Sequence, residues 1–185
     1  HLITSKALKK AFDKFMGSFR SRNANVFHCL APGTLIWREI TAQQLCGYTP
    51  IEDFKAGDGV VTHEGRVRKV LQVITHVNSG KILNLELDNI TVIKITDEHP
   101  ILTKKDGWKK AKELIVGDVL MYPSEKWFIP IDVNNEIRGT NYGAKPNLLF
   151  EGAKVTKVTQ DFYSGLVYNL EVEEDNSYLT EFATV

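Results

Sequence analysis

The sequence predicts an all-β fold, because strand signals dominate the 185-residue chain from Cys29 onward. Short runs rich in β-branched residues recur, and glycine-containing turn pairs separate many of them. Many short strands with regular turns are typical of an all-β architecture. The expected strands are residues 34–37, 67–77, 82–87, 91–96, 154–159 and 166–173, and the expected turns are Glu64-Gly65, Ser79-Gly80, Asp106-Gly107 and Ser164-Gly165. Only residues 51–56 and 109–114 resemble short helical turns.

An internal repeat is the second observation, and it indicates a duplicated β subdomain. The segment SGKILNLEL at residues 79–87 matches SGLVYNLEV at 164–172, and FKAGD at 54–58 matches LIVGD at 114–118. The second copy is longer by about 25 residues, around 124–151, since its Gly-Asp to Ser-Gly spacing is 47 residues against 22. Two halves related by a pseudo-twofold axis would bring Cys29 and the C-terminal end into one cleft.

Residues 1–28 differ from the rest of the chain. Apolar residues recur there at helical spacing with lysines between them, which predicts a short amphipathic helix followed by a polar linker at 21–25. A basic amphipathic helix can bind a membrane or a calmodulin-like groove. Packing on a parent protein is the better interpretation, because the apolar face has no Trp and the charges are mixed.

The composition argues against several classes of protein. The 23 basic and 23 acidic residues give a formal net charge of zero, so nothing supports binding driven by charge to nucleic acid or a membrane. Two cysteines are too few for a disulfide scaffold or a Cys-based zinc site, and we expect no metal and no cofactor. The sequence contains no run of about 18 apolar residues, so it predicts no membrane span. Without an initiator Met or a secretory pattern, the sequence reads as part of a larger intracellular, cytoplasmic protein, and we expect a monomer.

Cys29 and the motif Thr96-x-x-His99 are the candidate chemistry. A thiolate attacks carbonyl carbon well, and the nearest carbonyl is that of His28, across the amide nitrogen of Cys29 itself. Attack would convert this amide into a thioester, an N-to-S acyl shift. His99 could protonate the departing amine, and Thr96 could donate a hydrogen bond to the scissile carbonyl. Taken singly, a buried inert cysteine and a structural histidine are the more common interpretations.

Six short motifs in a fixed order resemble those of inteins, within the Hint superfamily of protein-splicing and hedgehog-type autoprocessing domains. They are CLAPGT at 29–34, GDGVV at 57–61, TDEHPIL at 96–102, GWKKAKEL at 107–114, GD at 117–118 and VYNLEV at 167–172. The resemblance implies a horseshoe-like all-β Hint fold of two related halves over residues 29–185. It also implies that residues 1–28 are the end of an N-extein, the host sequence that is spliced. The interval between the halves is too short for a homing endonuclease, so we expect no DNA cleavage.

Carried over from the family, the resemblance makes Cys29 the first nucleophile, with Thr96 and His99 activating the bond to His28. Asn169 falls where many inteins have an Asp that coordinates the two cleavage steps. Asn176 falls where many have a His that assists C-terminal cleavage. Both are departures, because Asn keeps the hydrogen bonding of these residues and loses their titration.

Asn169 also has a purely structural interpretation, since Asn84 occupies the equivalent position of the first repeat. Cys46 is interpreted as a bystander, with a regulatory disulfide to Cys29 as the alternative.

Inteins usually end in His-Asn, followed by Cys, Ser or Thr as the acceptor. Here the sequence reaches Val185 in what the resemblance identifies as the strand before such a pair. We therefore expect the residues as given to support only the N-terminal half of splicing. Two alternatives stay open: a Hint domain that cleaves itself without ligation, and a non-catalytic β-rich interaction module. The expected partners are the flanking extein sequences of the chain itself.

Overall fold

The computed structural model describes residues 28–39, 47–88, 91–123 and 150–185, and in this part of the chain the fold is all-β as predicted. Two short 3-10 helices interrupt the strands. The predicted amphipathic helix within residues 1–28 lies outside the described residues. In chain order the elements are β1 (Leu35–Trp37), β2 (Tyr48–Pro50), η1 (Ile51–Asp53), β3 (Gly59–Val61), β4 (Val67–Leu87), β5 (Val92–Ile95), β6 (Pro100–Thr103), β7 (Gly107–Lys110), η2 (Ala111–Glu113), β8 (Val119–Pro123) and β9 (Phe150–Val172).

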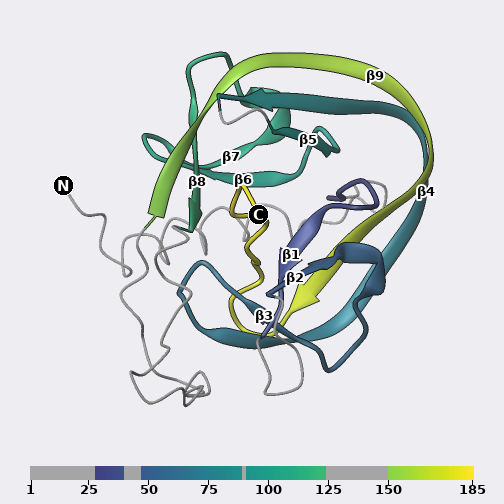
Figure 1. Cartoon of the computed structure of the whole chain (residues 1–185). Coiled ribbons are helices and arrows are strands. Elements are labelled where there is room, and N and C mark those ends of the chain that lie inside the picture. Colours follow the sequence, from purple (N-terminus) through teal and green to yellow (C-terminus); the bar gives the residue numbers. More distant parts are fainter. Residues whose placement is uncertain (1–27, 40–46, 89–90, 124–149) are drawn as a thin grey trace.

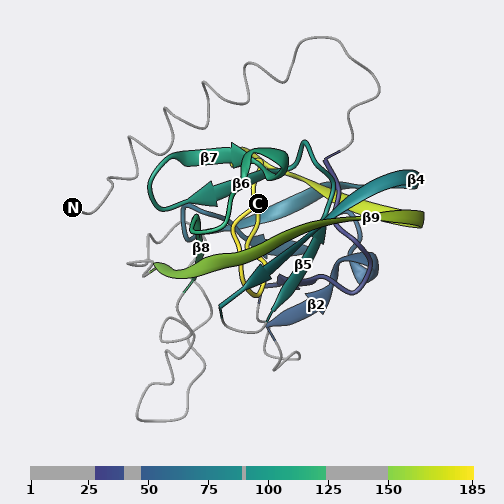
Figure 2. The same cartoon turned by 90° about the horizontal axis from the view of Figure 1, so that it is seen from above.

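Two long strands, β4 and β9, form the frame of the molecule. They pair antiparallel over almost their whole length and run side by side along an arc, inside which the shorter strands lie (Figure 1). The main sheet has the strand order β3-β4-β9-β8-β6-β7, and β5 pairs with β4, while β1 and β2 form a separate two-stranded sheet. Figures 1 and 2 show the C-terminal end within this arc rather than outside it.

The pairing of β4 with β9 confirms the predicted duplication. Ser79 pairs with Ser164, and these are equivalent positions of the repeat, so they meet at the pseudo-twofold axis. The ladder is interrupted twice, after the pair of Val70 with Val172 and before the pair of Leu87 with Val155. The twofold relation between the two copies of the repeat maps each of these pairs onto the other. One β-bulge therefore occurs in each half, at equivalent positions, as expected for a duplicated strand.

Two of the four predicted turns are wrong. Ser79-Gly80 and Ser164-Gly165 lie within the continuous strands β4 and β9, so each pair of strand runs expected on either side is one strand. Glycine followed by alternating residues suggested a hairpin, but the long ladder between the halves supplies hydrogen bonds that keep both segments extended. The other two predicted turns are confirmed, with Gly65 at φ 74° and Gly107 at φ 72°.

Equivalent turns precede β3 and β8. Gly57 and Gly117 adopt φ values of 94° and 101°, which favour glycine over residues with a Cβ. The next residue closes each turn with its carboxylate, which accepts the backbone N–H of Lys55 at 2.9 Å from Asp58 and that of Ile115 at 3.0 Å from Asp118. The short helical turns expected before these residues are 3-10 helices of three residues each.

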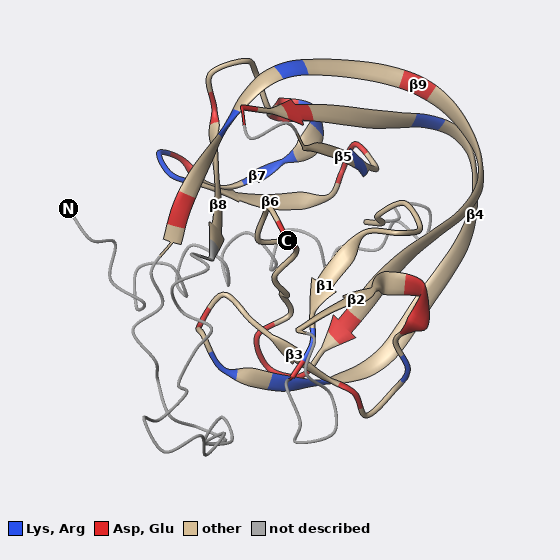
Figure 3. Ribbon diagram, viewed as in Figure 1, with Lys and Arg blue, Asp and Glu red and all other residues tan. Residues whose placement is uncertain are grey.

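The core fills the interior of the arc and includes the last residues of the chain. Among its members Leu30, Ile95, Leu120 and Leu179 are completely buried, and Val185 is 3% exposed. Basic and acidic residues are interspersed along the strands in Figure 3, in keeping with the zero net charge of the sequence. In the described part of the chain, no helix has the length and apolar character to span a membrane.

Candidate active site

The segment that begins at Cys29 lies as a short strand between β5 and β9. Leu30 exchanges two backbone hydrogen bonds with Tyr168 of β9, at 2.8 and 2.9 Å, and bridges Ile95 of β5 on its other side. The carbonyl oxygen of Cys29 accepts the backbone N–H of Thr96 at 3.0 Å. Backbone bonds on both sides therefore fix the position of Cys29 in the centre of the fold.

The amide of Cys29 is bonded to the side chain of Thr96. Its N–H donates to Thr96 Oγ1 at 2.8 Å, and the Thr96 hydroxyl lies 3.2 Å from the carbonyl oxygen of Cys29. Both residues are buried, with Cys29 only 1% exposed. Burial raises the pKa of the Cys29 thiol to about 11, so the sulfur is protonated at neutral pH.

A tight turn brings His99 back beside Thr96. The backbone N–H of His99 donates to the carbonyl oxygen of Thr96 at 3.2 Å, three residues earlier, as in a β-turn. Helix η2 holds this turn from outside, because Ala111 N–H donates to His99 O and Lys112 N–H to Asp97 O, both at 2.8 Å. The Thr-x-x-His spacing thus places both side chains at one turn after β5.

His99 is buried and uncharged. Its residue is 2% exposed, and its Nδ1 has no hydrogen-bond partner among the described residues. Burial, and secondly charge on His28, lowers the His99 pKa to about 3. The His28 ring packs edge-on against it, with the ring centroids 6.3 Å apart and the planes at 87°. His99 is therefore a neutral imidazole at physiological pH, able to accept one proton and to donate another.

His28 is also fixed in orientation. Its Nδ1 lies 2.9 Å from the carbonyl oxygen of Glu98, and since a carbonyl can only accept, this nitrogen carries the proton. Burial lowers the pKa of His28, against the raising effects of Glu98. His28, which carries the carbonyl of the peptide bond before Cys29, is thus anchored to the same turn as Thr96 and His99.

Asn169 joins the site together with Tyr178, a residue that the sequence analysis missed. The hydroxyl of Tyr178 donates to Asn169 Oδ1 at 2.8 Å. The backbone of Tyr178 pairs with that of Val185 at 2.8 and 3.1 Å. One signal could have revealed it: a tyrosine among apolar residues near the chain end needs a partner for its hydroxyl if it is buried.

Asn176 is not brought to these residues. It is exposed, lies in a turn after β9 with φ 47°, and its Nδ2 donates to the backbone oxygen of Glu174 at 3.3 Å. Asparagine tolerates this left-handed conformation better than most residues, which gives Asn176 a structural role in the turn.

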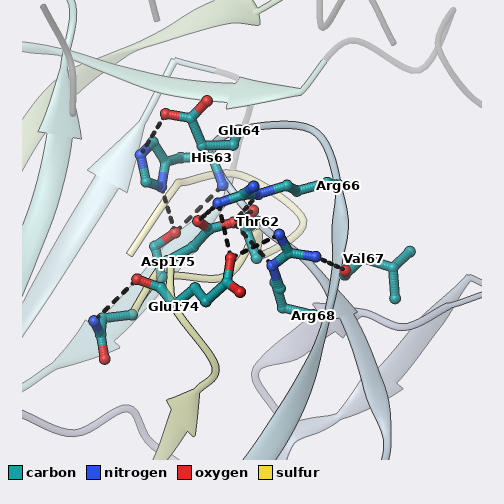
Figure 4. A network of polar contacts seen from close by, with 10 residues as sticks. Thr62, His63, Glu64, Arg66, Val67, Arg68, Glu174 and Asp175 are labelled. Atoms are coloured by element: carbon teal, nitrogen blue, oxygen red, sulfur yellow. Dashed lines mark hydrogen bonds and ion pairs between the residues drawn. The ribbon is translucent and has the colours of Figure 1, made fainter. Parts of the chain in front are cut away.

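A polar network holds this turn against the loop between β3 and β4 (Figure 4). The buried carboxylate of Asp175 accepts hydrogen bonds from Arg66 and from the Thr62 hydroxyl. The ring of His63 lies 2.6 Å from the hydroxyl of Ser177. Because Ser177 is followed directly by Tyr178, the network fixes the start of the segment that carries Tyr178 and Val185.

Within the described ranges, no group of three or more His, Cys, Asp or Glu side chains could hold a metal ion. The site residues supply one thiol, one hydroxyl, one neutral imidazole and one carboxamide.

The sequence matches a known protein family. The family model described as the intein splicing domain matches residues 49–185, most of the chain. The chain belongs to the intein splicing domain family. The family carries out autocatalytic protein splicing, a self-processing reaction. The matched residues include Thr96, His99 and Asn169, and Cys29 precedes them.

Solved structures agree with this assignment. The bacterial intein-like domain from Clostridium thermocellum is 25% identical, with a TM-score of 0.60 over 86% of this chain and 99% of that one. The DnaB intein from Synechocystis is 18% identical, with a TM-score of 0.58 over 86% of this chain and 97% of that one, which shows that the fold is shared. The horseshoe-like Hint fold expected from the motifs is thereby confirmed.

Curated relatives match shorter stretches. An uncharacterized protein of Methanocaldococcus jannaschii is 31% identical over an alignment of 130 residues, which covers 52% of this chain and 16% of that protein. A probable translation initiation factor IF-2 of Thermococcus kodakarensis is 29% identical over an alignment of 122 residues, which covers 60% of this chain and 10% of that protein. This chain thus spans only a small share of the length of these relatives.

Proposed function

We propose that this chain cleaves the His28–Cys29 peptide bond by an N-to-S acyl shift, as the first step of single-turnover protein splicing. In this proposal residues 1–28 are the end of an N-extein and residues 29–185 form the splicing domain. One observation supports it most: the amide nitrogen of the bond to be cleaved donates at 2.8 Å to Thr96, on the turn that carries the buried neutral His99.

The acyl shift balances within these groups. The Cys29 sulfur bonds to the carbonyl carbon of His28, and the bond from that carbon to the Cys29 nitrogen breaks. The thiol proton ends on the released amine, so no outside acid or base is consumed. His99, neutral and with a free Nδ1 among the described residues, can give one ring proton to the nitrogen as the C–N bond breaks while its other ring nitrogen takes up the proton that sulfur releases, so no imidazolium builds up, in keeping with its low pKa. Thr96 directs the nitrogen throughout.

The later steps need groups other than those assigned to the first step. Transesterification needs an acceptor nucleophile, and release needs an Asn that cyclises before the acyl group returns to an amide. The position of Val185 supports this order, because it is buried and paired with Tyr178, whose side chain reaches Asn169. All groups assigned to the first step lie on one chain, so the reaction as proposed needs no partner beyond the flanking exteins. The family match does not favour the alternative of a non-catalytic interaction module.

Thiol-induced cleavage tests the proposal. The purified chain is incubated with excess dithiothreitol and its intact mass is followed over time. Attack of the thiol on a thioester at His28 should release residues 1–28, and Cys29→Ala should release nothing. A folded wild-type chain that stays whole, or a Cys29→Ala chain that is cut at the same bond, would contradict the assignment.

A further inference from the structure

The backbone register places the side chain of Asn169 beside the thiol of Cys29. Leu30 and Tyr168 exchange both of their backbone hydrogen bonds, so they form a hydrogen-bonded antiparallel pair. The next pair in such a ladder is of the non-hydrogen-bonded kind, and here it consists of Cys29 and Asn169. Side chains of such a pair lie on one face of the sheet, with Cβ atoms roughly 5 Å apart. Asn169 is thus the cross-strand neighbour of the nucleophile.

The carboxamide of Asn169 is held in one orientation. Its Oδ1 accepts two hydrogen bonds, from the backbone N–H of Leu170 at 2.9 Å and from the Tyr178 hydroxyl at 2.8 Å. A carboxamide oxygen has two lone pairs, so its accepting capacity is used. Among the described residues, Nδ2 has no acceptor. The group therefore presents N–H donors to whatever lies at its free end.

The equivalent asparagine of the first half is oriented the other way. Asn84 donates from Nδ2 to Asp161 at 2.6 Å, and its buried Oδ1 has no partner in the described part of the chain. The duplicated fold alone therefore does not dictate the orientation of Asn169. Asn84 has the Asp161 carboxylate as its partner and Asn169 has the Tyr178 hydroxyl, so the partner accounts for the orientation in each half.

Tyr178 is itself firmly placed. It is 2% exposed, and its backbone is paired with Val185. Burial raises the pKa of Tyr178, and negative charge on Cys29 raises it further. The hydroxyl therefore stays protonated as the thiolate forms and keeps its role as donor to Asn169. The dependence on Cys29 also agrees with the short separation that the register gives.

We propose that Tyr178 is a positioning residue, whose hydroxyl holds the Asn169 carboxamide with Nδ2 toward Cys29, so that an N–H donor stabilises the negative charge on sulfur as it attacks. This inference rests on the acyl shift proposed above and goes beyond it. No proton leaves Asn169 or Tyr178. An aspartate at residue 169 would accept a proton and repel the thiolate, so this chain stabilises the charge at a position that lacks a base.

The test compares Tyr178→Phe, Asn169→Ala and the double variant by the rate of dithiothreitol-induced cleavage. A hydrogen bond to a charged group typically changes a rate by about tenfold or more, so each single variant should cleave about tenfold more slowly. The double variant should be no slower than Asn169→Ala, because Tyr178 acts through Asn169. Tyr163→Phe is the matched control: it removes an exposed hydroxyl bonded at 3.0 Å to Leu166 O, and its rate should equal that of the wild type.

The pH profile separates positioning from a general structural effect. If Nδ2 stabilises the thiolate, both single variants should shift the rise of the cleavage rate to higher pH. A structural defect would lower the rate equally at every pH. Thermal unfolding shows whether Tyr178→Phe is folded; if it is not, Asn169→Ala, which keeps the tyrosine, gives the decisive profile.

Three results would overturn the inference. They are a Tyr178→Phe rate within twofold of the wild type, additive effects in the double variant, or an unshifted pH profile. If the wild type itself does not cleave, the proposed function fails, and the inference is then tested by NMR of the folded chain. The Asn169 side-chain amide should respond to titration of the Cys29 thiol in the wild type and lose that response in Tyr178→Phe; no response in the wild type refutes it.

Discussion

Replacing Thr96 with valine removes one oxygen next to the His28–Cys29 bond, the bond proposed to be cleaved, and changes the side-chain volume little. In the native chain that oxygen accepts the Cys29 N–H at 2.8 Å and lies 3.2 Å from the Cys29 carbonyl. The carbonyl keeps a partner in the variant, because it also accepts the Thr96 backbone N–H at 3.0 Å. The N–H of Cys29 loses its hydrogen bond to the Thr96 side chain, so the variant isolates the interaction with the nitrogen that leaves in the proposed reaction.

The variant should lose both stability and cleavage rate, by different amounts. A buried N–H without a partner costs about 1–3 kcal/mol of unfolding free energy, so Thr96→Val should remain folded with a lower melting temperature. The effect on cleavage should be larger, because the nitrogen changes from amide to amine during the reaction and needs directed hydrogen bonding most at that point. Removal of one such group typically costs about 100-fold in rate, and we expect a decrease of that order.

Thr103→Val is the matched control for this experiment. Thr103 is as buried as Thr96, donates to Gly107 O at 2.7 Å and accepts the Asp106 N–H at 3.3 Å, at the turn between β6 and β7. It should lose similar stability and keep its cleavage rate. Both variants are assayed by intact mass with excess dithiothreitol, at a temperature where denaturation curves show more than nine-tenths folded protein.

The reasoning is refuted if Thr96→Val cleaves within threefold of Thr103→Val. In that case the hydrogen bond at Thr96 would only stabilise the fold. An equal loss of rate in both variants would indicate that cleavage follows overall stability, and the assignment of Thr96 would have to be withdrawn.

Two further predictions concern stability. The pKa of His99 is about 3 in the folded chain against an ordinary value of 6.5, so between these two pH values the unfolded state binds more protons than the folded state. The free energy of unfolding should therefore fall as the pH drops from about 6.5 toward 3, and His99 should contribute up to about 1.4 kcal/mol per pH unit to this fall. Urea denaturation at several pH values should show a shallower fall in His99→Gln, and an unchanged slope would contradict the burial argument. Asp175→Asn should cost about 2 kcal/mol, because it weakens the bonds from Arg66 and Thr62, whereas Glu174→Gln on the exposed side of the same turn should cost little; equal effects of the two would show that burial does not matter there.

Much of this architecture could be predicted from the sequence, because local patterns and the repeat carry it. Gly57 and Gly117, each followed by Asp, are turn signals with a mechanism, and both turns form. Ser79-Gly80 was predicted to be a turn and is not one. The tendency of this pair to form a turn is outweighed by the hydrogen bonds that the strand makes with its second copy. That pairing is long-range and leaves no local trace.

The candidate site divides in the same way. The motif identified Thr96 and His99 as candidates, but the turn between β5 and β6 that brings them together was not predicted. Tyr178 was missed because its role depends on two strands distant in sequence, and an isolated aromatic residue is usually core. The placement of Asn176 could not be predicted either, because its left-handed turn is set by the network around Asp175, built from a distant loop.

The pseudo-twofold symmetry explains why the site forms where it does. Leu30 pairs with Tyr168 of β9, and Ile95 pairs with Leu83 of β4, the repeat-equivalent of Tyr168. Leu30 and Ile95 therefore occupy equivalent places, and they bridge each other. By the same register Asn84 faces Lys94 in the first half, where Asn169 faces Cys29 in the second. The scaffold thus offers two equivalent positions, and it has a cysteine in only one. On this argument the symmetric frame supplies rigidity, and the proposed reaction depends on the few residues, Cys29 and Tyr178 among them, by which the halves differ.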